Sequence, residues 1–239
     1  MDSLYIVFMG NNFQLKILPK PQDVCSEAAN IFASLLSTNG KNNFIVPGGK
    51  TPKFFYRFIG ERVSDLTDIT MLLSDDRLVK EESKESNIGM LKNNLLKNIQ
   101  HDNLPRVVSI FEWGKGGRPT KIINSYAHSL CPFKAAFLGV GKDGHTASLF
   151  PGLITDTNSD SFIFVKRQEE VFERVSVSFQ TLTEIPYLVF MVTGAQKKNV
   201  LKDIVNGNKK IPQLVIQKVI NNAKDHVLII CDQDAASDL

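Results

Sequence analysis

The sequence predicts an α/β fold with a mainly parallel, twisted sheet flanked by helices. Short, almost continuous apolar runs alternate with amphipathic stretches along the chain, as expected of buried parallel strands and the helices that cover them. The length of 239 residues suits one domain of this class, so residues 1–239 are expected to form a single domain. Such sheets bind ligands beyond the carboxyl ends of their strands, and functional side chains are expected there.

Each expected element has its own local signal. The apolar runs 4–9 and 13–18 flank Gly10-Asn11-Asn12 and predict a hairpin. Apolar residues then recur at helical spacing over 22–36, further helices should begin near Pro52 and after a cap at Ser86, and another helix is expected near 120–130. The remaining apolar runs predict strands at 43–46, 69–73, 107–111, 135–140, 162–165, 175–179, 187–192 and 227–230.

Composition excludes several classes of function. The net charge is only +3 and the basic residues are scattered, so no nucleic-acid partner is expected. The cysteines Cys25, Cys131 and Cys231 are odd in number and far apart, which suits a reducing compartment and neither a disulfide framework nor a zinc site. No secretory signal is apparent and the apolar runs are too short to span a bilayer, so we expect a cytoplasmic protein with no membrane partner.

Four segments that follow predicted strands carry polar residues suited to a ligand. The first is Gly48-Gly49-Lys50-Thr51-Pro52, whose two glycines let backbone amides approach an anion. Thr51 is a good N-cap, and Pro52 suits the first helical position. A helix N-terminus of this kind is a phosphate site, although a tight turn that only opens a helix uses the same residues.

The second segment is Ser74-Asp75-Asp76-Arg77. Arginine holds phosphate through a bidentate fork, and the two aspartates are candidates for orienting it, for acid–base chemistry or for binding a metal. A solvated charge cluster with a local ion pair explains the same residues without a ligand. The sequence leaves open whether either aspartate contacts a substrate.

The third segment, residues 139–152, contains the histidine best placed for catalysis. His145 follows a buried strand, and Asp143 is in place to fix its orientation or tautomer. The glycines that clear space around the histidine are Gly139, Gly141 and Gly144. Histidine suits proton transfer near neutral pH, whereas the other three histidines lie in ordinary polar or helical settings.

The fourth segment, residues 193–197, opens a helix at Gly194 and places Lys197 on its first turn. The helix dipole disfavours a lysine there, so either an anionic ligand or simple solvation accounts for it. Arg174 opens the strand at 175–179 and is either a further phosphate contact or a surface charge.

Together and in order, these segments resemble the 6-phosphogluconolactonase family over nearly the whole chain. The family elements are a Gly-Gly-x-Thr-Pro turn, an acidic pair before arginine, Ser-Asn before a helix, a long Gly-x-Gly-x-Asp-Gly-His-Thr-Ala-Ser-Leu-Phe-Pro-Gly motif, Arg-Val-Ser/Thr and Thr-Gly-x-x-Lys. Here they stand at Gly48 to Pro52, Asp75 to Arg77, Ser86-Asn87, Gly139 to Gly152, Arg174 to Ser176 and Thr193 to Lys197. The long histidine motif is the specific one.

The resemblance implies a fold, a reaction and a set of site residues. It implies one α/β domain with a modified Rossmann-like sheet, hydrolysis of 6-phospho-D-glucono-1,5-lactone to 6-phosphogluconate in the oxidative pentose phosphate pathway, and no metal or organic cofactor. It leaves open a monomer or a small homo-oligomer. His145 and Asp143 are then the expected catalytic residues, and the expected substrate-binding residues are Gly48, Gly49, Thr51, Arg77, Gly144, Arg174 and Lys197.

The implied mechanism is attack by water. His145 would act as general base on the water and then return the proton to the ring oxygen, while Arg77, Lys197 and the amides around Gly48 and Gly49 clamp the phosphate. Ser148 lacks the pattern of a nucleophile elbow. The chain departs from the family pattern at Pro47, Asp76, Lys80 and the acidic segment 168–173. These departures bear on the phosphate contacts, above all on that of Arg174.

Two other functions share parts of the pattern. Glucosamine-6-phosphate deaminases also have a Gly-Gly turn, an acidic pair and Asp-Gly-His, but their histidine segment supplies a carboxylate, whereas residues 146–152 here contain no acid. Their acidic pair is commonly followed by tyrosine, and here Arg77 follows. A non-catalytic sugar-phosphate sensor would usually carry a DNA-binding helix-turn-helix, for which the N-terminal hairpin and single helix leave no room.

Overall fold

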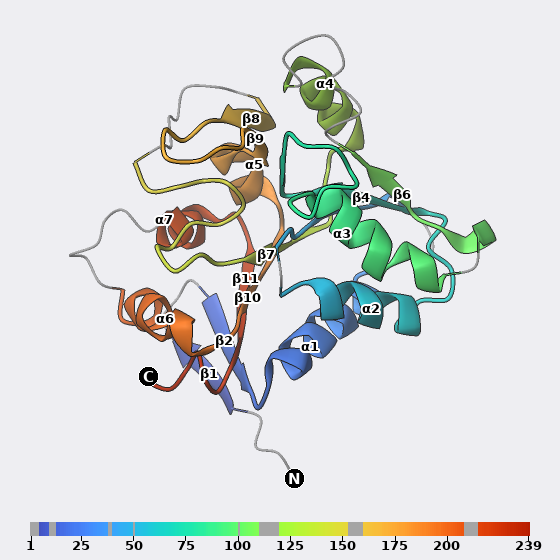
Figure 1. The fold of residues 1–239 in the computed structure, drawn as a ribbon. Helices are drawn as coiled ribbons and strands as arrows, with labels where there is room; N and C mark the ends of the chain where they lie inside the picture. The colour runs from blue at the N-terminus through green and yellow to red at the C-terminus, as the bar shows by residue number, and fades with distance from the viewer. Residues whose placement is uncertain are drawn as a thin grey trace.

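The computed structural model describes residues 5–9, 13–37, 40–49, 51–99, 101–109, 120–152, 160–207 and 215–239. Within them the main sheet has eight strands in the order β1-β2-β11-β10-β7-β3-β4-β6, all parallel to their neighbours except in the β1–β2 hairpin (Figure 1). The strands are β1 (Tyr5–Met9), β2 (Phe13–Leu18), β3 (Asn42–Val46), β4 (Ile69–Leu73), β6 (Arg106–Val108), β7 (Ala135–Gly139), β10 (Tyr187–Val192) and β11 (His226–Asp232). The predicted fold class is confirmed.

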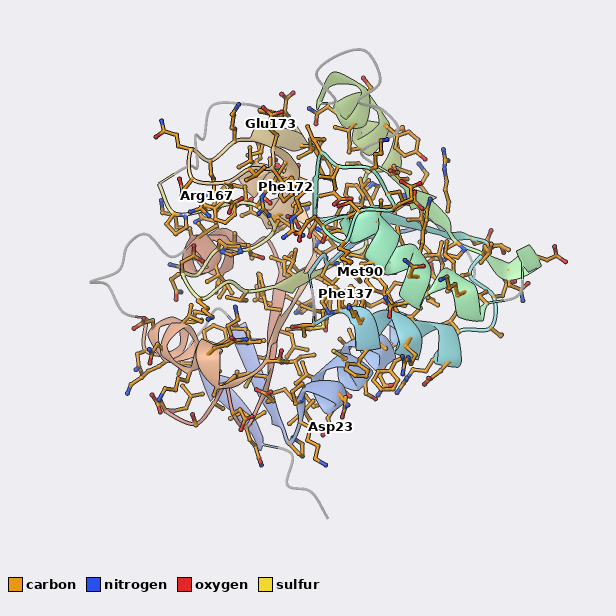
Figure 2. All side chains as sticks on the ribbon, viewed as in Figure 1. Asp23, Met90, Phe137, Arg167, Phe172 and Glu173 are labelled. Carbon is orange, nitrogen blue, oxygen red and sulfur yellow. The ribbon has the colours of Figure 1, made fainter. Side chains whose placement is uncertain are left out.

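Alternate residues of the central strands enter two separate cores. Phe44 and Val46 of β3, with Phe137 of β7, pack on one face of the sheet, whereas Ile45 and Leu138 pack on the other. Phe137 lies in the middle of the molecule (Figure 2). Because both faces are covered, these strands are apolar almost throughout, and this is the signal that identified them in the sequence.

Helices cover the two faces in chain order. The first face is covered by α1 (Pro21–Ser34), α2 (Lys53–Arg62) and α3 (Asn87–Asn94). The second is covered by α4 (Thr120–Leu130), α5 (Phe179–Glu184), α6 (Lys198–Val205) and α7 (Val215–Asn222). Figure 1 shows α1–α3 to one side of the strands and α6 and α7 to the other. Among the described residues, no helix combines the length and the apolar character needed to cross a membrane.

A second, three-stranded antiparallel sheet was not predicted. Its central strand β9 (Arg174–Val177) pairs with β5 (Asp75–Arg77) on one side and β8 (Phe162–Val165) on the other. β5 consists of three charged residues, so it has no apolar alternation that would reveal a strand. The strand predicted at 175–179 ends at Val177, because the Ser178 hydroxyl accepts a hydrogen bond from the Thr181 amide and caps α5.

Two predicted helix starts have different outcomes. The Ser86 hydroxyl caps α3 as predicted and accepts from the Gly89 amide at 3.1 Å. The prediction that Thr51 caps the next helix is wrong, because α2 begins at Lys53 after Pro52. The Thr51 hydroxyl lies instead 3.2 Å from the hydroxyl of Thr193, at the end of β10.

The strand predicted at 107–111 is observed as β6, which ends at Val108. The last two residues of the predicted strand lie outside the described residues.

Candidate active site

A cavity of about 500 Å³ lies at the carboxyl ends of four neighbouring strands, β4, β3, β7 and β10. Each of the four polar segments identified in the sequence follows one of these strands. From β3 the chain continues to β4 and β6 on one side, whereas β7 and β10 lie on the other, so the cavity spans a point where the strand order reverses. The lining includes these predicted residues: Gly48, Gly49, Thr51, Arg77, Asp143, His145, Arg174 and Lys197.

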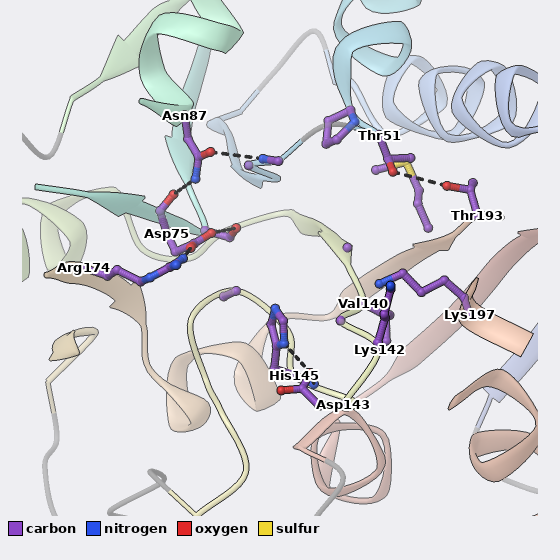
Figure 3. Close-up of a pocket in the computed structure, with 18 of the residues that line it drawn as sticks. Thr51, Asp75, Asn87, Val140, Lys142, Asp143, His145, Arg174, Thr193 and Lys197 are labelled. Atoms are coloured by element: carbon purple, nitrogen blue, oxygen red, sulfur yellow. Dashed lines mark hydrogen bonds and ion pairs between the residues drawn. The ribbon is translucent and has the colours of Figure 1, made fainter. Parts of the chain in front are cut away.

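His145 and Asp143 form a hydrogen-bonded pair in this lining (Figure 3). Nδ1 of His145 lies 2.5 Å from Oδ1 of Asp143. A carboxylate at Nδ1 holds the ring proton there, so Nε2 of the neutral imidazole is left as a proton acceptor. Burial raises the pKa of Asp143, but the charge and hydrogen bonds of His145 outweigh it and leave that pKa below its usual value.

Gly144 does not line the cavity, contrary to its expected role as a binding residue. Its backbone adopts a φ of +78°, which favours glycine, and its carbonyl accepts from the Ile216 amide at 3.1 Å. Its own amide donates to the carbonyl of Gly141. Gly144 therefore shapes the turn that carries His145.

The glycine pair after β3 is tied to α3. The Gly49 amide donates to Oδ1 of Asn87 at 3.1 Å, and Nδ2 of Asn87 donates to the carbonyl of Asp75 at 2.8 Å. A Cβ atom at Gly48 would lie 2.0 Å from that same Nδ2. The expectation that the Gly49 amide is free for an anion is therefore not met, because Asn87 already accepts its hydrogen bond.

The two arginines are engaged by other parts of the protein. Arg77 donates from Nη1 to the carbonyl of Glu85 at 3.0 Å, and its buried Nε has no hydrogen-bond partner among the described residues. Arg174 is held by Glu170, with Nε and Nη2 at 2.9 and 2.6 Å from Oε2. The unusually acidic segment before Arg174 thus supplies its partner. Arg77 and Arg174 are also register partners between β5 and β9.

The acidic pair before Arg77 divides into two roles. Asp76 accepts hydrogen bonds from the amides of Asn87 and Ile88 and so holds the start of α3. Burial raises the pKa of Asp76 to about 6, against the lowering effect of these bonds and of the Arg77 amide. Asp75 accepts a 2.5 Å hydrogen bond from the buried Ser148 hydroxyl.

Within the described ranges, no group of three or more His, Cys, Asp or Glu side chains is placed to hold a metal ion.

Lys197 is the last residue of a 3₁₀ turn over Ala195–Lys197 and directly precedes α6. Burial lowers its pKa, the charge of Lys142 lowers it further, and Asp143 acts in the opposite direction. Figure 3 shows the amino ends of Lys142 and Lys197 at one spot, with His145 between them and the Asp75–Arg174 pair. Lys142 is a lining residue that sequence reasoning missed. Its place directly before Asp143, in a turn after a strand, was the available signal.

The chain matches known proteins over most of its length. A family model described as "Glucosamine-6-phosphate isomerases/6-phosphogluconolactonase" matches residues 21–227. A 6-phosphogluconolactonase of Rhizobium meliloti (strain 1021) is 31% identical over 71% of this chain and 75% of that protein. One of Caulobacter vibrioides is 26% identical over 91% of this chain and 96% of that protein.

Solved structures show the same fold. The structure of "6-phosphogluconolactonase from Trypanosoma cruzi" has a TM-score of 0.81 at 22% identity and covers 98% of this chain and 99% of that one. A "monomeric glucosamine-6-phosphate deaminase" has a TM-score of 0.76 at 15% identity, covering 94% of this chain and 99% of that one. At these identities the likeness shows the fold alone, and the sequence matches carry the assignment. The chain belongs to the glucosamine-6-phosphate isomerase/6-phosphogluconolactonase family.

Proposed function

We propose that the protein is a 6-phosphogluconolactonase, a hydrolase that converts 6-phospho-D-glucono-1,5-lactone to 6-phosphogluconate in the oxidative pentose phosphate pathway. The observation that carries the proposal is the Asp143–His145 pair, set in a cavity that cationic side chains also line. An oriented imidazole next to cations suits hydrolysis of an anionic ester. Sequence relatives that bear the lactonase name support the choice of substrate.

In the proposed reaction His145 acts as general base. Its Nε2 takes a proton from a water molecule as the water oxygen attacks the lactone carbonyl carbon. The resulting tetrahedral intermediate collapses with cleavage of the bond to the ring oxygen, and the imidazolium returns its proton to that oxygen. Asp143 keeps the proton on Nδ1 throughout and stabilises the imidazolium by its negative charge.

Phosphate recognition is proposed to rest on Arg77 and Lys197, with Arg174, Gly48, Gly49 and Thr51 shaping the rest of the site. Binding energy at the phosphate, remote from the reacting bond, holds the carbonyl next to His145 and so lowers the barrier. Lys197 forms no ion pair with the residues described and is free to bind an anion. Arg77 has to exchange its contacts with Glu85 for the ligand.

Features of the cavity favour the lactonase over the deaminase. The acidic residues among those that line it are Asp75 and Asp143, and these are already bonded to Ser148 and His145. The proposed reaction uses no metal ion and no organic cofactor.

The free thiols of Cys25, Cys131 and Cys231 support a reducing, cytoplasmic setting.

The direct test measures acid release from freshly generated 6-phosphogluconolactone with and without the protein. The lactone also opens spontaneously, so the uncatalysed rate is subtracted at each protein concentration. The proposal expects a rate that rises in proportion to protein concentration and saturates with substrate. A rate equal to the spontaneous one, together with ammonia release from glucosamine 6-phosphate, would favour the deaminase.

A further inference from the structure

Two lysines from different strand ends line the cavity, and no ion pair with a described residue balances their charge. Lys142 follows β7 and Lys197 follows β10, and Figure 3 shows their amino ends together. Asp143 attracts Lys197 electrostatically, yet no ion pair joins either lysine to a carboxylate among the residues the structure describes. Like charges held together in this way repel each other. Burial is the main cause of the lowered pKa of Lys197, and repulsion from Lys142 lowers it further.

The arginines on the other side of His145 differ in this respect. Arg174 is paired with Glu170 and lies 3.9 Å from Asp75, and Arg77 is engaged by Glu85. An anion that binds there competes with contacts already made. An anion that binds between the lysines displaces no ion pair with the described residues, and its charge relieves the repulsion between the two ammonium groups.

We infer that Lys142 binds the phosphoryl group of the substrate together with Lys197, in addition to the contact proposed for Arg77, which makes Lys142 a specificity-determining residue. The inference rests on the proposed function. A phosphate monoester carries a charge of about −1.5 to −2 at neutral pH, so two ammonium groups match it where one does not. The lysine pair therefore favours a phosphorylated lactone over the unphosphorylated sugar lactone.

The test compares Lys142→Met with two other variants. Lys142→Arg restores the charge, and Lys202→Met removes one charge from an exposed position of α6 that does not line the cavity. KM and kcat are measured for 6-phosphogluconolactone and for unphosphorylated gluconolactone. Calorimetry gives the dissociation constants of 6-phosphogluconate and gluconate, which do not depend on turnover.

For Lys142→Met we expect KM for the phosphorylated lactone and Kd for 6-phosphogluconate to rise about fivefold or more, the size of a lost charge-assisted contact at a partly exposed site. The kcat should stay within about twofold, and both unphosphorylated ligands should be unaffected. Lys142→Arg should recover most of the loss, and Lys202→Met should match the wild type.

A pH series adds a readout that altered folding would not produce. With Lys142 gone, the pKa of Lys197 should rise towards its usual value under the remaining influence of Asp143. Whatever affinity for 6-phosphogluconate remains should then persist to higher pH in Lys142→Met than in the wild type.

The inference is overturned if Kd for 6-phosphogluconate is unchanged in Lys142→Met, or if phosphorylated and unphosphorylated ligands weaken equally. It is also overturned if Lys202→Met shows the same loss, which would point to net charge alone. Failure of the proposed function is a separate outcome. In that case the wild type does not accelerate lactone hydrolysis, while the binding measurements still decide the role of Lys142.

Discussion

The imidazole of His145 occupies space that a side chain at Gly141 would fill. A Cβ atom at Gly141 would lie 2.0 Å from Nδ1 of His145 and 2.6 Å from Oδ1 of Asp143. The Gly141 amide also donates to the His145 carbonyl at 2.8 Å, which folds the turn back on itself. The missing side chain at position 141 is therefore a condition for the contact between the proposed base and its carboxylate.

Gly141→Ala should lower kcat for 6-phosphogluconolactone by tenfold or more, because the added methyl group displaces the imidazole from Asp143. A positioned acid–base group contributes about 10²–10⁴-fold to the rate, and part of this is lost when the group moves. KM should change little, since the cationic residues stay in place. Steady-state kinetics on the purified variant gives both constants.

Gly60→Ala is the matched control. In α2 a Cβ at Gly60 meets side-chain atoms only at ordinary contact distances of 3.6 Å or more, and alanine favours a helix by up to about 1 kcal/mol. This variant should keep full activity and unfold at the same or a higher temperature. If Gly141→Ala is folded and equally active, the packing of position 141 against His145 has no part in catalysis.

Neutralising Lys197 or Arg77 should raise KM for the phosphorylated lactone by about tenfold or more, because charge-assisted contacts are worth roughly 1.5–3 kcal/mol. We expect the larger effect for Lys197→Met, since Arg77 is already engaged by Glu85. The KM for unphosphorylated gluconolactone should change little in either variant. If KM rises equally for both lactones, these side chains do not hold the phosphate.

Asp76 should make stability depend on pH in the acidic range. Its pKa is raised to about 6 in the folded protein, whereas a free aspartate has a pKa of about 3.9. Between these values the folded state binds more protons than the unfolded state, so the contribution of Asp76 to stability rises as pH falls from about 6 to about 4.

Urea unfolding of the wild type and Asp76→Asn at pH 4 to 7 tests this sign. The free energy of unfolding of the wild type relative to the variant should increase by about 1–3 kcal/mol towards the lower pH. A decrease in that direction would mean that the amides of Arg77, Asn87 and Ile88 hold the pKa of Asp76 below its usual value.

Prolonged chelation should leave activity intact. Asp75 and Asp76, the acidic pair next to Arg77, are occupied by the Ser148 hydroxyl and by backbone amides. Dialysis against a chelator followed by the lactone assay measures the effect. Activity that is lost and then restored by a divalent ion would place these aspartates in a metal site.

The location of the cavity could be predicted because the carboxyl ends of neighbouring parallel strands meet at one edge of the sheet. The His145–Asp143 pair could be predicted because both residues lie in one short turn. Other contacts join residues remote in sequence, and no local pattern records them. The bond from Gly49 to Asn87 and the meeting of Lys142 with Lys197 are of this kind. The strand at Asp75–Arg77 was not predicted, because it is defined by its pairing with β9, which is remote in sequence.

The central claim is that His145 is the general base, and the pH dependence of kcat/KM for wild type and His145→Ala tests it most directly. The measurement belongs on the acidic side, because spontaneous lactone hydrolysis accelerates at high pH. In the wild type, kcat/KM should fall towards acidic pH, since only the neutral ring accepts a proton.

His145→Ala should stay folded and bind 6-phosphogluconate, lose about 10²–10⁴-fold in kcat with little change in KM, and lack the acidic limb of the profile. A folded His145→Ala protein that retains most of its activity, with the acidic limb unchanged, would contradict the account and remove His145 from the reaction.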